Sequence, residues 1–228
     1  MDKLYLYEEI MLLALRDNEG TIASGTMYTF AISGAIIAEL LLSQRIAVED
    51  NRRRKLVDVI DSTPYGDPLI DECLLKMRSA KRRAALATWV SRFSNMRNLK
   101  HRVAGQLCKR GILRADEDQI LLIFTRKIYP ELNPEPEREI KERLQQAIFT
   151  EKQDVDPRTV VLISLAANTN LLKTNFDKKE LKSRKVRIKA ITDGEATGKA
   201  AAEAIQAMQA AIMAATIVPA IAATTVSS

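Results

Sequence analysis

The segment from Met27 to Ser43, MYTFAISGAIIAELLLS, is apolar on nearly every side of the helix that it predicts. A helix at a protein surface keeps one polar face, so a helix that is apolar all round lies inside the fold. Its candidate core residues are Phe30, Ile32, Gly34, Ile36, Ile37, Leu40, Leu41 and Leu42. A chain of 228 residues is long enough to surround such a helix. We therefore expect a core built around residues 27–43.

Helical periodicity recurs along most of the remaining sequence. LYLYEEIMLLALRDNEG predicts a first helix that stops at Asn18–Gly20. Further helices are predicted at 69–78, 82–93, 96–110, 137–149, from Pro157 onward after the N-cap Asp156, and in the basic segment 176–191. Short strands at 46–48 and 56–60 form one predicted hairpin, and GILRADEDQILLIF forms another. The sequence therefore predicts a mainly α fold, a single helical domain with small β-hairpins.

No clear boundary divides residues 1–198, which we interpret as one helical domain. Residues 199–228 form a separate alanine-rich C-terminal helix or tail. Alanine is weakly apolar, and Glu203 with two glutamines makes insertion of this tail into a bilayer costly. We expect the tail to pack on the domain or to lie at a membrane surface. The opening MDKLYLYEEI lacks the basic and apolar regions of a secretory signal, which predicts a cytoplasmic protein.

The charge balance and the absence of catalytic motifs limit the classes of function. Lysine and arginine number 35 against 29 acidic residues, a formal charge of +6 at pH 7. This balance favours nucleic acid, anionic lipid or acidic protein as a partner without choosing among them. The sequence has no P-loop, no glycine-rich dinucleotide turn and no histidine pair for a metal, because His101 is its one histidine. We expect no enzyme activity, no catalytic or metal-binding residues and no cofactor.

Two acidic pairs and two cysteines have structural interpretations. Glu8–Glu9 and Asp71–Glu72 are adjacent residues that cannot both face one substrate from a helix. We interpret them as solvated or capping carboxylates. Cys73 and Cys108 each lie in an apolar helical pattern, which is typical of buried free thiols.

Several motifs, in order along the chain, resemble the Golgi phosphoprotein three family. They are LYLYEEIMLLALRDNEG, AIIAELLLSQRI, TPYGDPLIDECL, HRVAGQLCKRGIL, PEREIKERLQQAI and DPRTVVLISLAANTNLL. The resemblance extends from Leu4 to Ala190. It implies a mainly helical domain and a peripheral membrane protein without catalysis. It also implies an adaptor that binds phosphatidylinositol 4-phosphate on the cytosolic face of a membrane, the Golgi membrane in a eukaryote.

The resemblance also implies a lipid-headgroup site. In eukaryotic members of the family, a tryptophan and an arginine early in the domain act with two later arginines spaced i, i+3. Gly25 and Gly34 stand at the two early positions, whereas Arg97 and Lys100 stand at the later pair. We expect Arg97 and Lys100, with Arg102, to bind the anionic headgroup.

The basic residues near His101 also have plainer interpretations. One uninterrupted helix would place Arg97, Lys100 and His101 on one flank, since residues three and four apart are neighbours, with Arg102 on the other. This could be a solvated face whose long side chains cover the edge of the core. The basic segment 178–189 could instead attract an anionic membrane without any headgroup site, because each basic residue near such a surface contributes about 1 kcal/mol.

Two other classes of function stay open. A basic helix followed by a hairpin occurs twice, with Arg52–Lys55 in one turn, which is typical of a winged-helix-like nucleic-acid binder. The helix at 96–110 offers little polar variety for reading bases, which counts against that function. A protein-binding scaffold without a lipid site is favoured by Gly25 and Gly34. The resemblance also implies that the hairpin at Gly111–Phe124 mediates self-association. The protein could therefore form a homo-oligomer.

Overall fold

The computed structural model describes residues 3–16, 18–49, 56–120, 124–151 and 153–195. Within them the helices are α1 (Leu6–Ala14), α2 (Tyr28–Leu42), α3 (Pro68–Arg78), α4 (Leu86–Ser94), α5 (Leu99–Lys109), α6 (Glu135–Phe149), α7 (Pro157–Asn168), α8 (Leu171–Asn175), α9 (Lys178–Ser183) and α10 (Lys185–Thr192). The strands are β1 (Ile46–Val48), β2 (Val57–Val59), β3 (Asp116–Ile120) and β4 (Phe124–Ile128). They form two separate antiparallel hairpins, β1–β2 and β3–β4. The predicted mainly α fold with small hairpins is confirmed.

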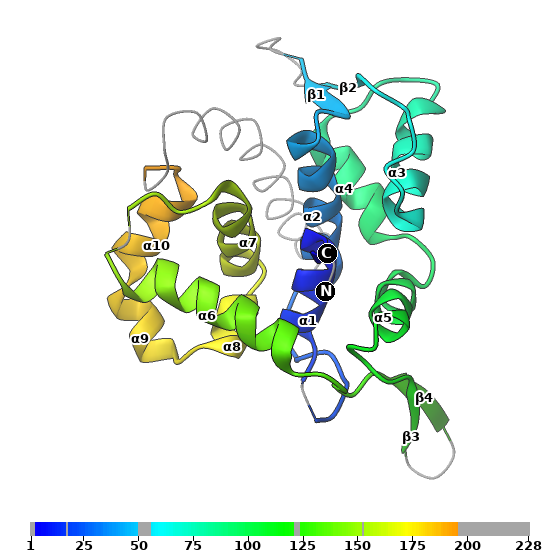
Figure 1. The fold of residues 1–228 in the computed structure, drawn as a ribbon. Helices are drawn as coiled ribbons and strands as arrows, with labels where there is room; N and C mark the ends of the chain where they lie inside the picture. The colour runs from blue at the N-terminus through cyan, green and yellow to red at the C-terminus, as the bar shows by residue number, and fades with distance from the viewer. Residues whose placement is uncertain (1–2, 17, 50–55, 121–123, 152, 196–228) are drawn as a thin grey trace, which may run out of the picture.

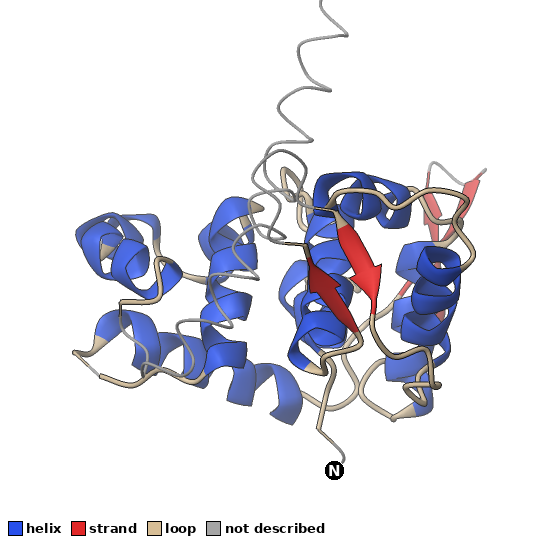
Figure 2. Ribbon diagram, turned by 90° about the horizontal axis from the view of Figure 1, so that it is seen from above, coloured by secondary structure: helices blue, strands red, loops and turns tan. Residues whose placement is uncertain are grey.

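Helices α1 and α2 occupy the centre of the molecule. Every residue of α1 is buried, as is the whole run Ala31–Leu40 of α2. In Figure 1, α3, α4 and α5 lie on one side of this pair and α6 to α10 lie on the other. Seen from above, in Figure 2, the helices again divide into two groups. The expectation that residues 27–43 form a central buried helix is therefore confirmed.

Two helices begin later than their sequence patterns predict. Helix α4 was expected from residue 82, but Ala85 is extended and forms an antiparallel bridge with Leu56. The residues before Leu86 therefore extend the small sheet of β2 rather than the helix. Helix α5 was expected from residue 96, but Asn98 has a left-handed backbone with φ of 56°. A left-handed residue cannot continue a right-handed helix, so α5 begins at Leu99.

The basic segment 176–191 forms two short helices instead of one. The break lies at Arg184, between α9 and α10. The Arg184 guanidinium donates to the Phe149 carbonyl at 2.7 Å and pairs with Glu151 at 2.6 Å, which fixes the break against the end of α6.

The predicted alanine-rich tail, residues 199–228, lies outside the described residues, and so does the end of the predicted domain at residue 198. Among the helices that are described, none is both long and apolar enough to cross a membrane.

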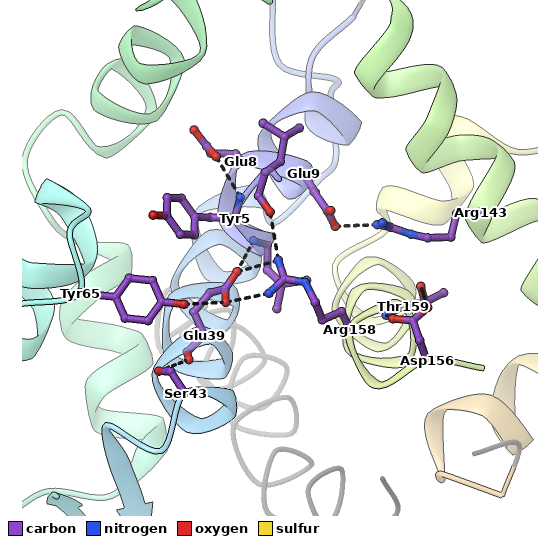
Figure 3. Close-up of polar contacts among 12 residues, drawn as sticks. Tyr5, Glu8, Glu9, Glu39, Ser43, Tyr65, Arg143, Asp156, Arg158 and Thr159 are labelled. Carbon is purple, nitrogen blue, oxygen red and sulfur yellow. Dashed lines mark hydrogen bonds and ion pairs between the residues drawn. The ribbon is translucent and has the colours of Figure 1, made fainter. Parts of the chain in front are cut away.

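A buried ion pair joins three helices of the core, as Figure 3 shows. Both Glu39 carboxylate oxygens, on α2, accept hydrogen bonds at 2.8 Å from the Arg158 guanidinium, on α7. The same carboxylate accepts the Leu6 N–H of α1 at 2.7 Å, and Arg158 also donates to the Leu4 carbonyl at 3.0 Å. Tyr65 adds a longer hydrogen bond to Glu39 at 3.4 Å. The start of α1, the last turn of α2 and the start of α7 are thereby held in one register.

Glu8 and Glu9 are buried, so their interpretation as solvated carboxylates is wrong. Their relative exposures are 1% and 3%. Glu8 accepts the Tyr5 N–H at 2.9 Å, which confirms a capping role, and pairs with Arg110 at 3.2 Å. Glu9 pairs with Arg143 of α6 at 2.7 Å, as Figure 3 also shows. Burial raises the pKa of both carboxyl groups, and the paired arginines oppose that rise.

The contacts and burial of the other acidic pair, Asp71 and Glu72, and of the two cysteines indicate structural roles. Asp71 accepts the backbone N–H of Tyr65 at 2.5 Å, in the loop before α3, and Asp67 rather than Asp71 is the N-cap of that helix. Glu72 is partly exposed and pairs with basic side chains. Cys73 is fully buried, which raises the pKa of its thiol to about 12, whereas Cys108 is only partly buried.

Replacing Arg158 with alanine should strongly destabilise the fold, because it leaves the Glu39 carboxylate buried without its partner. We expect the free energy of unfolding, measured by urea denaturation, to fall by about 3–5 kcal/mol. Arg138→Ala is the matched control, since Arg138 pairs with Glu135 at the surface. That change should cost about 1 kcal/mol or less. If both variants lost the same free energy of unfolding, the buried ion pair would stabilise the fold no more than a surface pair does.

Candidate functional site

A groove of about 730 Å³ lies where three segments meet: the loop between α1 and α2, the first turn of α5, and strand β4. Four permanently basic side chains line it, Arg16, Lys100, Arg126 and Lys127. Glu19 is the one acidic residue among those that line it. The groove therefore has an excess of positive charge, which favours an anionic ligand.

Two of these cations have carboxylate partners and two do not. Arg16 pairs with Glu19 at 2.7 Å, and Arg126 pairs across the hairpin with Asp118 at 2.7 Å. Among the described residues, no carboxylate lies within ion-pair distance of Lys100 or Lys127. Burial, together with the nearby Arg126 charge, lowers the pKa of Lys100. A partly buried cation that lacks a counter-ion is a common feature of ligand sites.

Tyr129, just after β4, holds the side chains at the start of α5. The Lys100 ammonium lies 5.9 Å from the centroid of the Tyr129 ring, within the range of a cation–π contact. His101 Nδ1 lies 2.7 Å from the Tyr129 hydroxyl oxygen. Burial lowers the pKa of His101, and the charges of Lys100 and Lys127 lower it further. The imidazole is therefore neutral at pH 7, and the charge of the groove comes from lysine and arginine.

The amino-terminal end of α5 opens into the same groove. Asn98, Lys100 and His101 all line it. The first turn of a helix carries amide N–H groups without intrahelical acceptors and the positive end of the helix dipole. Asn98 does not cap this end with its side chain. Such an arrangement suits a phosphate or a carboxylate.

The structure places the three residues expected from the sequence in different surroundings. Lys100 lines the groove. Arg97 is exposed in the turn before Asn98 and does not line the groove, so the expected helical flank of Arg97 with Lys100 is wrong. Arg102 forms an ion pair with Glu72 of α3. Of the three, the described structure brings only Lys100 into the groove.

Neither of the two glycines of the resemblance is among the residues that line the groove. Gly25 is in the loop before α2, where a side chain would meet open space, and Gly34 is buried within α2. Arg16, Arg126 and Lys127 are not among the site residues expected from the sequence. Nothing in their spacing in the sequence relates them to Lys100. The one feature of the sequence that could have indicated a site there is the adjacent basic pair Arg126–Lys127 in the returning strand of the hairpin.

A protein-family model described as Golgi phosphoprotein 3 (GPP34) matches residues 6–208. The chain belongs to the GPP34 family. Vacuolar protein sorting-associated protein 74 of Eremothecium gossypii is 26% identical over 201 residues, which cover 74% of this chain and 60% of that protein. This GPP34-family chain thus spans about 60% of the length of this curated relative. The family resemblance of the sequence motifs is confirmed.

Within the described residues, no group of three or more His, Cys, Asp or Glu side chains could hold a metal ion. The basic groove at the start of α5 is the candidate site, because four cations line it.

His101 gives a direct test of the electrostatics of the groove, because it is the one histidine and has a unique imidazole NMR signal. We expect its titration midpoint below the ordinary value of 6.5, since burial and neighbouring cations disfavour the imidazolium. Lys100→Gln and Lys127→Gln should each raise the midpoint. An unfolded chain would bind the proton more tightly, so this group makes the fold less stable as pH falls through 6.5. A midpoint above 6.5 that neither substitution moves would contradict the arrangement.

Proposed function

We propose that this GPP34-family protein is a non-catalytic, peripheral membrane adaptor that binds an anionic lipid headgroup in the groove at the start of α5. The headgroup is phosphatidylinositol 4-phosphate, and the protein acts at the cytosolic face of a membrane, the Golgi membrane in a eukaryote. The observation that carries the proposal is Lys100, a partly buried cation without a carboxylate partner among the described residues, in a groove lined by four cations and one carboxylate. Family membership supports the choice of lipid.

A phosphate monoester needs several donors that converge on it. Lys100 and Lys127 supply ammonium groups, and the first turn of α5 supplies backbone N–H groups. Arg16 and Arg126 become available when they exchange Glu19 and Asp118 for the phosphate. An arriving anion also stabilises the Lys100 ammonium, because it adds an opposite charge beside a cation that burial and the nearby Arg126 disfavour. The groove can therefore bind a doubly charged headgroup without rearranging a helix.

The other expected site residues have lesser parts in this proposal. Arg97 stands exposed next to the groove and reaches the headgroup from its rim. Arg102 keeps its ion pair with Glu72 and adds only long-range attraction. Gly25 and Gly34 offer no side chain to the ligand, so the contacts come from Arg16, α5 and β4.

Removing both unpaired lysines should abolish specific lipid binding while leaving the fold intact. We expect Lys100→Ala with Lys127→Ala to weaken flotation with phosphatidylcholine vesicles containing phosphatidylinositol 4-phosphate by about tenfold or more. The matched control is Lys81→Ala with Lys109→Ala, which removes the same charge from exposed residues outside the groove. The control should stay within about twofold of the wild type. If the two double variants lose binding equally, the attraction follows net charge and the groove is not the site.

A nucleic-acid-binding function receives less support from the structure. Helix α5, the candidate recognition helix, buries Leu99, Val103 and Leu107 in the core. Its flanking cations Arg102 and Arg110 are engaged with carboxylates of α3 and α1. The basic residues 52–55 of the other predicted wing lie outside the described residues. A protein-binding scaffold without a lipid site is the remaining alternative, and equal recovery with neutral and anionic vesicles would favour it.

We also propose that the β3–β4 hairpin, with the preceding turn from Gly111, mediates self-association. Its five pairs of residues run from Asp116 opposite Ile128 to Ile120 opposite Phe124, and Figure 1 shows it beside the end of α5, apart from the central helices. A two-stranded ribbon has two edges with unpaired backbone groups, which can pair with another copy. We expect sedimentation equilibrium to give a mass above 25.5 kDa that rises with protein concentration. A constant monomer mass would contradict self-association.

A further inference from the structure

The net charge of the chain is concentrated in one small region, which the proposed site does not include. Residues 171–192, which span α8, α9 and α10, contain eight basic and two acidic side chains, a formal charge of +6. This equals the formal charge of the whole chain. The remainder of the sequence is therefore balanced, and a second anion-attracting surface lies on these three helices.

Some of these cations hold the fold and others border a concave surface. Arg184 is bonded to the end of α6, and Arg187 donates to the Ala147 carbonyl at 3.1 Å. In contrast, Lys178, Lys182 and Lys185 line a groove of about 450 Å³ between α7, α8, α9 and α10. Among the described residues, no carboxylate lies within ion-pair distance of these three lysines.

The floor of this groove is apolar. It is made by Ala167, Leu172, Leu181 and Ile188, one from each of the four helices. Lys173 completes the basic rim, and its ammonium donates to the Asn170 side chain at 2.9 Å. An apolar floor under a ring of ammonium groups matches a ligand with one apolar part and one anionic part.

We propose that this groove binds a single-chain anionic amphiphile, a long-chain fatty acid, with its acyl chain on the apolar floor and its carboxylate among the lysines. The volume lies in the range of small-molecule sites, roughly 300–1,000 Å³. A planar bilayer cannot fill a concave surface of this kind. A docked acidic helix needs a row of anchor pockets along several turns, which is more than four floor residues provide. This site shares no residue with the groove at the start of α5, so the inference is independent of the proposed function.

The binding can be measured on the full chain with dansyl-labelled undecanoic acid, whose fluorescence rises in an apolar site. We expect saturable binding that monomeric palmitate displaces. Butyrate, which lacks the long chain, and hexadecanol, which lacks the charge, should displace it at least about tenfold less well. Displacement by butyrate as effective as that by palmitate would overturn the acyl-chain site. Displacement by an acidic helical peptide but not by palmitate would reassign the groove to a protein partner.

Two sets of variants locate the site. Lys182→Gln with Lys185→Gln should weaken probe binding about five- to tenfold. The control is Lys179→Gln with Lys189→Gln, which removes the same charge from the same helices outside the groove. The control should change probe binding less than twofold. Ala167→Trp should fill the floor and abolish binding, and its circular dichroism should remain that of the wild type. Lys100→Ala with Lys127→Ala should leave probe binding unchanged. Equal losses in the two glutamine pairs, or full binding by Ala167→Trp, would overturn the proposal.

Discussion

The contact on which this fold depends most is the ion pair of Glu39 and Arg158, because it places a charge on the buried last turn of a helix that has no other charged residue. A buried carboxylate is tolerated only when it is paired and its remaining lone pairs accept hydrogen bonds. Arg158 and the Leu6 N–H meet that requirement together. Sliding α1 along α2 by one turn would break the Leu6 contact, and sliding α7 along α2 would break the Arg158 contact. Burial of the apolar surfaces supplies most of the stabilisation, and the ion pair selects one alignment of α1 and α7 along α2.

This register also determines the shape of the candidate lipid site. Because α1 is held at its start, the loop that follows it reaches the hairpin at a fixed point. There the Tyr129 N–H donates to the Gly20 carbonyl at 2.8 Å. Gly20 has φ of 60°, and a Cβ at this position would collide with the backbone of Tyr129 and Pro130. Tyr129 in turn contacts His101 of α5. The loop, the hairpin and α5 are thus joined around one tyrosine, and the groove lies between them.

Sequence patterns predicted the parts of this structure that depend on local periodicity. The central helix, the β1–β2 hairpin and the N-cap at Asp156 are close to their expected positions. The break at Asn98 was not predictable, because asparagine is only weakly unfavourable in a helix and its left-handed φ is set by the surrounding fold. That single residue removed Arg97 from the expected flank. The groove combines cations from three segments far apart in sequence, and no spacing rule relates such residues.

The two basic surfaces differ in how their positive charge is distributed, and the net charge of the chain does not show this difference. The net charge of +6 was the reason to expect an acidic partner, yet residues 171–192 account for all of it. The groove at α5 lies in the balanced part of the chain, and its character comes from Lys100, whose charge is partly buried and unpaired. Salt screens exposed charges beyond about 10 Å at 0.1 M ionic strength, but it screens partly buried ones much less. Long-range attraction to an anionic surface therefore belongs mainly to α8–α10, whereas selection of a headgroup depends on the desolvated lysine at the start of α5.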